Sequence, residues 1–104
     1  MARFDVFANP TAAERGHTPY FLDVQNDFIA GLDSRVVVAL RTESAFGPRA
    51  QRLNPILDID GESVVLDTAS LSAVPLGALK RPVMRLGESH DAVRSALDAL
   101  FGAY

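Results

Sequence analysis

Residues 56–66 read Ile-Leu-Asp-Ile-Asp-Gly-Glu-Ser-Val-Val-Leu and predict a β-hairpin. Two mostly apolar segments, 56–59 and 63–66, lie on either side of a turn that contains Asp60-Gly61. An Asp-Gly pair tolerates the positive φ angles of a tight primed turn, the usual connection between two antiparallel strands. The middle of the chain is therefore expected to be antiparallel β-structure.

Further strands are expected on both sides of this hairpin. Residues 3–8 and 20–25 alternate apolar and polar side chains, which is the two-residue period of a half-buried strand. Residues 36–40 are apolar on both faces and mostly β-branched, as in a central strand. Residues 83–86 predict a short last strand.

The connecting segments are less regular. Residues 11–18 are polar and predict an exposed loop, and residues 42–54 are compatible with either a loop or a short helix. Pro75 and Pro82 bracket a segment that is expected to be irregular. No repeat or linker divides the chain, so residues 1–104 are expected to form one domain.

One helix is expected, beginning after Gly87. Ser89 is predicted to cap it by accepting hydrogen bonds from free backbone N–H groups, and Asp91 is favourably placed in its first turn. An apolar stripe recurs at helical spacing, at Val93, Ala96, Leu97, Leu100 and Phe101. Gly102 fits a left-handed stop after the last turn. The predicted fold class is mainly β with one C-terminal α-helix.

Composition limits the class of protein. The chain has 104 residues, of which 48% are apolar and 22% charged, enough for one core and unlike a disordered chain. The net charge is −3 and no stretch clusters arginine, so direct nucleic-acid binding is not expected. No apolar run is long enough to span a membrane, and cysteine is absent. A reducing compartment such as the cytoplasm is compatible with this composition, and no metal or cofactor is expected.

No catalytic centre is predicted from the residue types. The adjacent residues 89–91, Ser-His-Asp, cannot align as a hydrolytic triad. His17 and His90 lack metal-ligand spacing and are expected to be solvated. Asp23 and Asp27 are conceivable as paired catalytic carboxylates, but Asn26 and Asp27 at such a place more often close a turn through side-chain to backbone hydrogen bonds. The residues therefore point to binding and not to catalysis.

Several segments, in the same order along the chain, resemble the CcdB toxins of bacterial type II toxin–antitoxin modules. Residues 22–27, LDVQND, resemble the family's VDVQSD, and residues 35–40 look like its basic-then-apolar strand. Residues 53–59, LNPILDI, are similar to its LYPVVHI, and residues 72–75, SAVP, to its ASVP. The likeness covers nearly the whole chain.

The resemblance implies an SH3-like, antiparallel, barrel-like sheet with one C-terminal helix, assembled as a homodimer. Members of the family bind the A subunit of DNA gyrase and trap the enzyme on cleaved DNA without catalysing a reaction. A cognate antitoxin with a disordered C-terminal segment neutralises them. By alignment, the gyrase contacts of the family fall on Phe28, Ile29, Asp98, Phe101, Gly102, Ala103 and Tyr104.

The chain departs from the family at several of these positions. Gly102 stands where the family has a tryptophan that meets an arginine of gyrase, and this chain has no tryptophan. Asp98 replaces an asparagine and Phe28 an isoleucine. Tyr104 is a substitute aromatic two residues further on. Phe101 is a second one if it points outward, but its place in the apolar stripe favours core packing.

Three hypotheses follow. The favoured one is a gyrase poison with a modified contact set. The second is a toxin-fold binding protein whose toxicity is lost or redirected. The third is an endoribonuclease like the MazF toxins, which share this fold. It needs an acid–base pair and a transition-state arginine, for which the candidates are Arg41 or Arg85 near Glu43 or Asp67.

Overall fold

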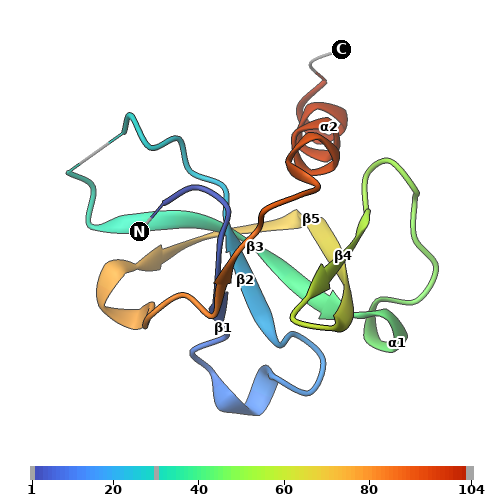
Figure 1. Cartoon of the computed structure of the whole chain (residues 1–104), viewed down its shortest axis with the longest axis horizontal. Coiled ribbons are helices and arrows are strands. Elements are labelled where there is room, and N and C mark those ends of the chain that lie inside the picture. The colour runs from blue at the N-terminus through green and yellow to red at the C-terminus, as the bar shows by residue number, and fades with distance from the viewer. Residues whose placement is uncertain (1, 30, 103–104) are drawn as a thin grey trace.

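The strands form one antiparallel sheet that curls into a nearly closed barrel (Figure 1). The computed structural model describes residues 2–29 and 31–102, and within them the sheet has six strands in the order β4-β5-β3-β2-β1-β6. The strands are β1 (Asp5–Ala8), β2 (Tyr20–Asp23), β3 (Ser34–Thr42), β4 (Ile56–Ile59), β5 (Glu62–Pro75) and β6 (Met84–Arg85). The predicted class, mainly β with a C-terminal helix, is confirmed.

The hairpin predicted at residues 56–66 is present. Asp60 and Gly61 adopt φ angles of 53° and 87°, and the Asp58 carboxylate accepts a hydrogen bond from the Gly61 amide at 2.9 Å. β5 is much longer than the predicted 63–66 because it continues to Pro75 along the whole of β3. A register shift opposite Val38 and Ala39 divides this pairing into two parts. The strand at residues 36–40 is central, as predicted.

Both faces of β1 are covered, whereas its alternation predicted a half-buried strand. Val6 packs into the main core inside the barrel. Phe7 points to the other face, where it forms a second cluster with Val37, Val74 and Leu79. The segment around the 3₁₀ turn η2 (Leu76–Ala78) supplies Leu79 and Ala78 to this cluster. It therefore covers a face that alternation alone leaves to solvent.

The remaining elements lie outside the sheet. They are the 3₁₀ turn η1 (Ala12–Glu14), the short helix α1 (Glu43–Phe46) and the C-terminal helix α2 (His90–Phe101). η1 lies in the exposed loop predicted at residues 11–18. Residues 42–54, for which a loop and a short helix were both compatible, contain the short helix α1. Thr42 caps it by accepting a hydrogen bond from the Ala45 amide. The rest of that segment is turn or irregular.

α2 packs on the main core through its first two turns. Val93 and Ala96 are buried, and Leu97 packs against the same cluster. Figure 1 shows the helix at one side of the barrel, with its C-terminal end directed away from the strands. The predicted Ser89 cap is wrong: within the described residues its side chain makes no capping bond, because its backbone is left-handed (φ 68°) and not extended.

Candidate functional site

The first part of the site is the turn after β2, residues 24–29, which a buried ion pair anchors. Asp23 is completely buried, and Arg35 of β3 contacts it with two nitrogens, Nε at 2.7 Å and Nη2 at 2.9 Å. Arg35 Nη2 also donates to the Gln25 carbonyl and to the Asp27 carboxylate, both at 3.3 Å. The hydrogen bonds that Arg35 donates to the Asp23 carboxylate raise the pKa of Arg35 above its ordinary value. One guanidinium thus fixes three residues at the base of the turn.

The turn that Asn26 and Asp27 were predicted to close is present, but of these two residues only Asn26 closes it. Asp23 accepts the Gln25 amide at 3.0 Å, and Asn26 Oδ1 accepts the Phe28 amide at 2.9 Å. Asp27 instead accepts the backbone amide of Arg3 at 2.8 Å. That bond, more than the contact with Arg35, lowers the pKa of Asp27 below its ordinary value. No local pattern of residues predicted the Arg35 anchor.

Two apolar side chains stand at the tip of this anchored turn. Phe28 is 96% exposed and Ile29 is 49% exposed. The Ile29 amide donates to the Asn26 carbonyl at 3.0 Å, which closes the turn beneath them. An exposed aromatic ring held on a fixed backbone offers apolar area at little further entropic cost. The turn therefore has the character of a binding anchor.

The second part of the site is the end of α2. Phe101 is 69% exposed, so the predicted preference for core packing is wrong. The core beneath the helix ends at Ala96 and Leu97, and the last turn extends past it. Asp98 and Gly102 are also exposed. Gly102 has φ 80° and its amide donates to the Asp98 carbonyl at 2.8 Å, which confirms the predicted left-handed stop. Ala103 and Tyr104 lie outside the described residues.

Arg3 and Phe4 connect the turn to the N-terminal half of α2. The Arg3 amide binds Asp27 of the turn, while the Phe4 ring stacks on His90 of α2 with centroids 4.0 Å apart. The Arg3 and Arg94 guanidinium carbons lie 5.1 and 5.4 Å from the centre of the same ring. These interactions hold the N-terminal segment against both the turn and α2.

The exposed face of α2 continues from this connection toward the helix end. Positions 94, 98 and 101 share one face of an α-helix, so Asp98 and Phe101 follow Arg94 along it. His90 is half-buried in its stack, and its Nε2 contacts the Leu86 carbonyl. The predicted solvated surface therefore holds for His17, which is exposed, and not for His90.

The residues considered for an endoribonuclease come together only in part. Arg41 Nη1 lies 3.6 Å from Asp67 Oδ2, and the Ser70 hydroxyl donates to the same oxygen at 2.7 Å. Both interactions lie beside the register shift between β3 and β5, and Asp67 is nearly buried. Arg85 instead lies 3.9 Å from Asp5, on the neighbouring strand, and not near Glu43 or Asp67. The Arg41–Asp67 pair is thus placed to stabilise a bulge.

Within residues 2–29 and 31–102, no group of three or more His, Cys, Asp or Glu side chains is placed to hold a metal ion. In the same residues no helix is long and apolar enough to cross a membrane.

Comparison with known proteins assigns a family to this architecture. No curated protein is matched by the chain. The family model described as CcdB protein matches residues 3–102, which include the anchored turn, all the strands and α2. The chain belongs to the CcdB family.

Proposed function

We propose that this chain is the toxin of a bacterial type II toxin–antitoxin system and that it poisons DNA gyrase by binding its A subunit. Membership of the CcdB family implies a toxin of a toxin–antitoxin system, and the family is known for non-enzymatic gyrase poisons. The proposal includes a homodimer in the cytoplasm and a cognate antitoxin with a disordered C-terminal segment. The observation that carries it is the exposure of Phe28 at the tip of the anchored turn.

The proposed docking surface comprises Phe28 and Ile29 of the turn and Asp98, Phe101 and Gly102 of the helix end. Ala103 and Tyr104 extend it in sequence. Large aromatic side chains in the middle of an interface contribute most of its binding energy. Phe28 and Phe101 fit that description because each presents most of its ring to water in the free chain.

Phe101 is proposed to take the role that the family's tryptophan has in gyrase binding. Gly102, which aligns with that tryptophan, ends α2 in a left-handed conformation that strains any residue with a Cβ. Gly102 ends the helix in this chain, and the nearest exposed aromatic ring in the described residues is that of Phe101, the preceding residue. The absence of the tryptophan favours a gyrase whose complementary surface differs from the one that the tryptophan recognises.

Calorimetric titration with a gyrase A-subunit fragment tests the proposal. Phe28→Ala and Ile29→Ala are each expected to weaken binding by about tenfold or more, as loss of an anchor does. Ile56→Ala is the matched control, because Ile56 is also an isoleucine and is similarly exposed (40%) but lies on β4, outside the proposed surface. Equal affinity of the Ile29 and Ile56 variants, or no binding by the unmodified chain, would contradict the proposal.

Induced expression separates the alternatives. Growth arrest with double-strand breaks is the result expected of a gyrase poison. Growth arrest with cleaved RNA indicates a ribonuclease, and unaffected growth indicates a non-toxic or retargeted binding protein.

A further inference from the structure

The barrel has a seam between its two edge strands, and a pocket occupies it. In the described part of the chain, β4 pairs only with β5 and β6 pairs only with β1, so each has one free edge. The pocket has a volume of about 500 Å³ and is lined by residues of both sides. The β4–β5 turn contributes Asp58, Asp60 and Gly61, and the chain from β6 to α2 contributes residues 84 and 86–89.

The free edge of β4 presents unpaired backbone groups. The Leu66 amide donates to the Pro55 carbonyl at 3.0 Å, and hydrogen-bonded positions alternate along an antiparallel pair. The N–H and C=O groups of Leu57 and Ile59 therefore point toward β5, and those of Ile56 and Asp58 point outward. An edge of this kind is a template for an added strand.

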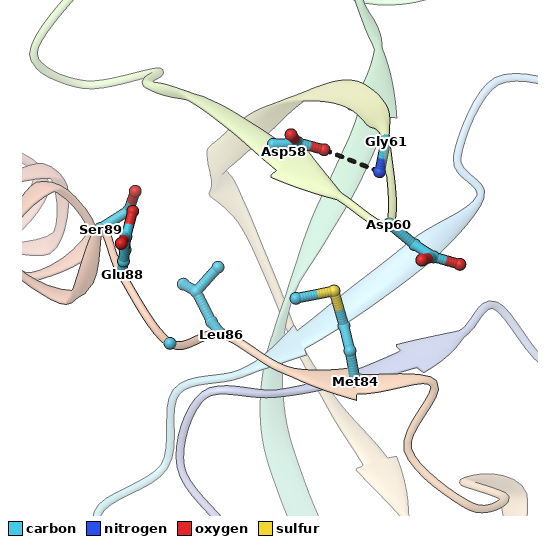
Figure 2. A pocket seen from close by; sticks show the side chains of 8 residues that line it. Asp58, Asp60, Gly61, Met84, Leu86, Glu88 and Ser89 are labelled. Carbon is cyan, nitrogen blue, oxygen red and sulfur yellow. Dashed lines mark hydrogen bonds between the residues drawn. The ribbon is translucent and has the colours of Figure 1, made fainter.

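The pocket combines an apolar floor with a negatively charged rim. Met84 and Leu86 lie on the same side of the chain and face the hairpin (Figure 2). Asp60 and Glu88 flank them from the two sides of the seam, and Asp58 uses one carboxylate oxygen to bind Gly61. Arg85, which alternates with Met84 and Leu86, extends toward Asp5 instead.

The rim carboxylates are not neutralised. Among residues 2–29 and 31–102, no ion pair involves Asp58, Asp60 or Glu88. The pKa of the nearby Tyr20 hydroxyl is raised, mainly by burial. The negative charges of Glu62 and Asp60 raise it further, as expected in a negative potential. A lysine or arginine matches this arrangement, because its aliphatic stem covers apolar side chains while its cation meets carboxylates.

We propose that the seam binds an extended, basic peptide segment of a partner protein, which adds as a strand to the edge of β4 and places a lysine or arginine over Met84 and Leu86 between Asp60 and Glu88. The site is separate from the surface proposed for gyrase, so it does not depend on that function. The strand supplies backbone hydrogen bonds, and the rim selects the sign of the side-chain charge.

Nuclear magnetic resonance titration of the full chain tests this with a short blocked peptide in which lysine alternates with valine. We expect a dissociation constant below about 1 mM, with shifts at the Met84 methyl group and the Ile56 and Asp58 amides. Hydrogen exchange of the Asp58 amide should slow in the complex. A peptide with glutamate in place of lysine should bind at least about tenfold more weakly. A lysine peptide whose valines are replaced by proline should also bind at least about tenfold more weakly, because proline cannot donate a backbone hydrogen bond to the strand edge.

The double variant Asp60→Asn/Glu88→Gln should weaken binding of the lysine peptide by about fivefold. Its control, Asp33→Asn/Glu43→Gln, removes the same charge at two exposed positions elsewhere and should leave the affinity unchanged. Several results would overturn the inference: no binding of the lysine peptide, equal binding of its glutamate or proline counterpart, or equal losses in the two double variants.

Discussion

Arg35→Leu tests the anchor beneath the Phe28 turn. The substitution leaves the fully buried Asp23 carboxylate with the Gln25 amide as its remaining hydrogen-bond donor in the described residues. Removing one member of a buried ion pair costs about 3–5 kcal/mol, because the remaining charge stays desolvated and unpaired. That is a large share of the roughly 5–15 kcal/mol by which a domain is usually stable. The melting temperature should fall by more than about 10 °C.

The double variant Asp23→Leu/Arg35→Leu separates charge desolvation from lost packing. With both charges removed, no carboxylate is left buried alone, so the double variant should be more stable than Arg35→Leu. Arg94→Leu is the control for an arginine in an exposed pair: Arg94 lies 3.5 Å from Asp91, and its loss should cost less than about 1 kcal/mol.

Urea unfolding followed by circular dichroism measures these free energies, at one protein concentration because association changes apparent stability. A loss below about 1 kcal/mol for Arg35→Leu would refute the reasoning. So would a double variant whose loss equals the sum of the losses measured separately for Asp23→Leu and Arg35→Leu, since that result leaves no coupling between the charges.

Three further predictions concern the helix end and the turn. Phe101→Ala should weaken binding of the gyrase A-subunit fragment by about tenfold in calorimetry while changing stability by no more than about 0.5 kcal/mol, because its ring contributes little to the core; a large loss of stability would contradict its outward placement. Gly102→Ala should lower the free energy of unfolding by about 1–2 kcal/mol in urea titration, because φ is 80° there; no change would argue against the left-handed stop. Asp27→Asn should be less stable than the unmodified chain at neutral pH. Because the pKa of Asp27 is lowered in the folded chain, the stability that its carboxylate contributes is lost as the pH falls below the ordinary value of 3.8 and through the folded pKa. The free energies of unfolding of the two proteins, measured by urea titration at a series of pH values, should therefore converge in acid.

The elements predicted correctly from the sequence are those with a local cause. Asp60-Gly61 specifies its own turn, the apolar residues 36–40 lie in a central strand that buries Val37 and Val38 in two different core clusters, and Gly102 ends a helix whose stripe is visible in the sequence. Each of these depends on residues that are neighbours in the chain, so periodicity and turn chemistry are sufficient to find them.

The features that were missed depend on contacts between distant segments. The length of β5 is hidden because the bulge opposite Val38 interrupts its alternation. The core does not extend beneath Phe101, and this is a property of how α2 lies on the barrel. Arg35 reaches Asp23 only because β2 and β3 are paired. For the candidate site, the resemblance located the positions, and the structure added their anchor and their exposure.

The most direct test of the proposed function is a DNA cleavage assay with purified gyrase, supercoiled plasmid and this chain. After the proteins are denatured, linear DNA should accumulate with the unmodified chain and should be greatly reduced with Phe28→Ala. Plasmid that is supercoiled and relaxed by gyrase as if the chain were absent, with no linear product, would contradict the account.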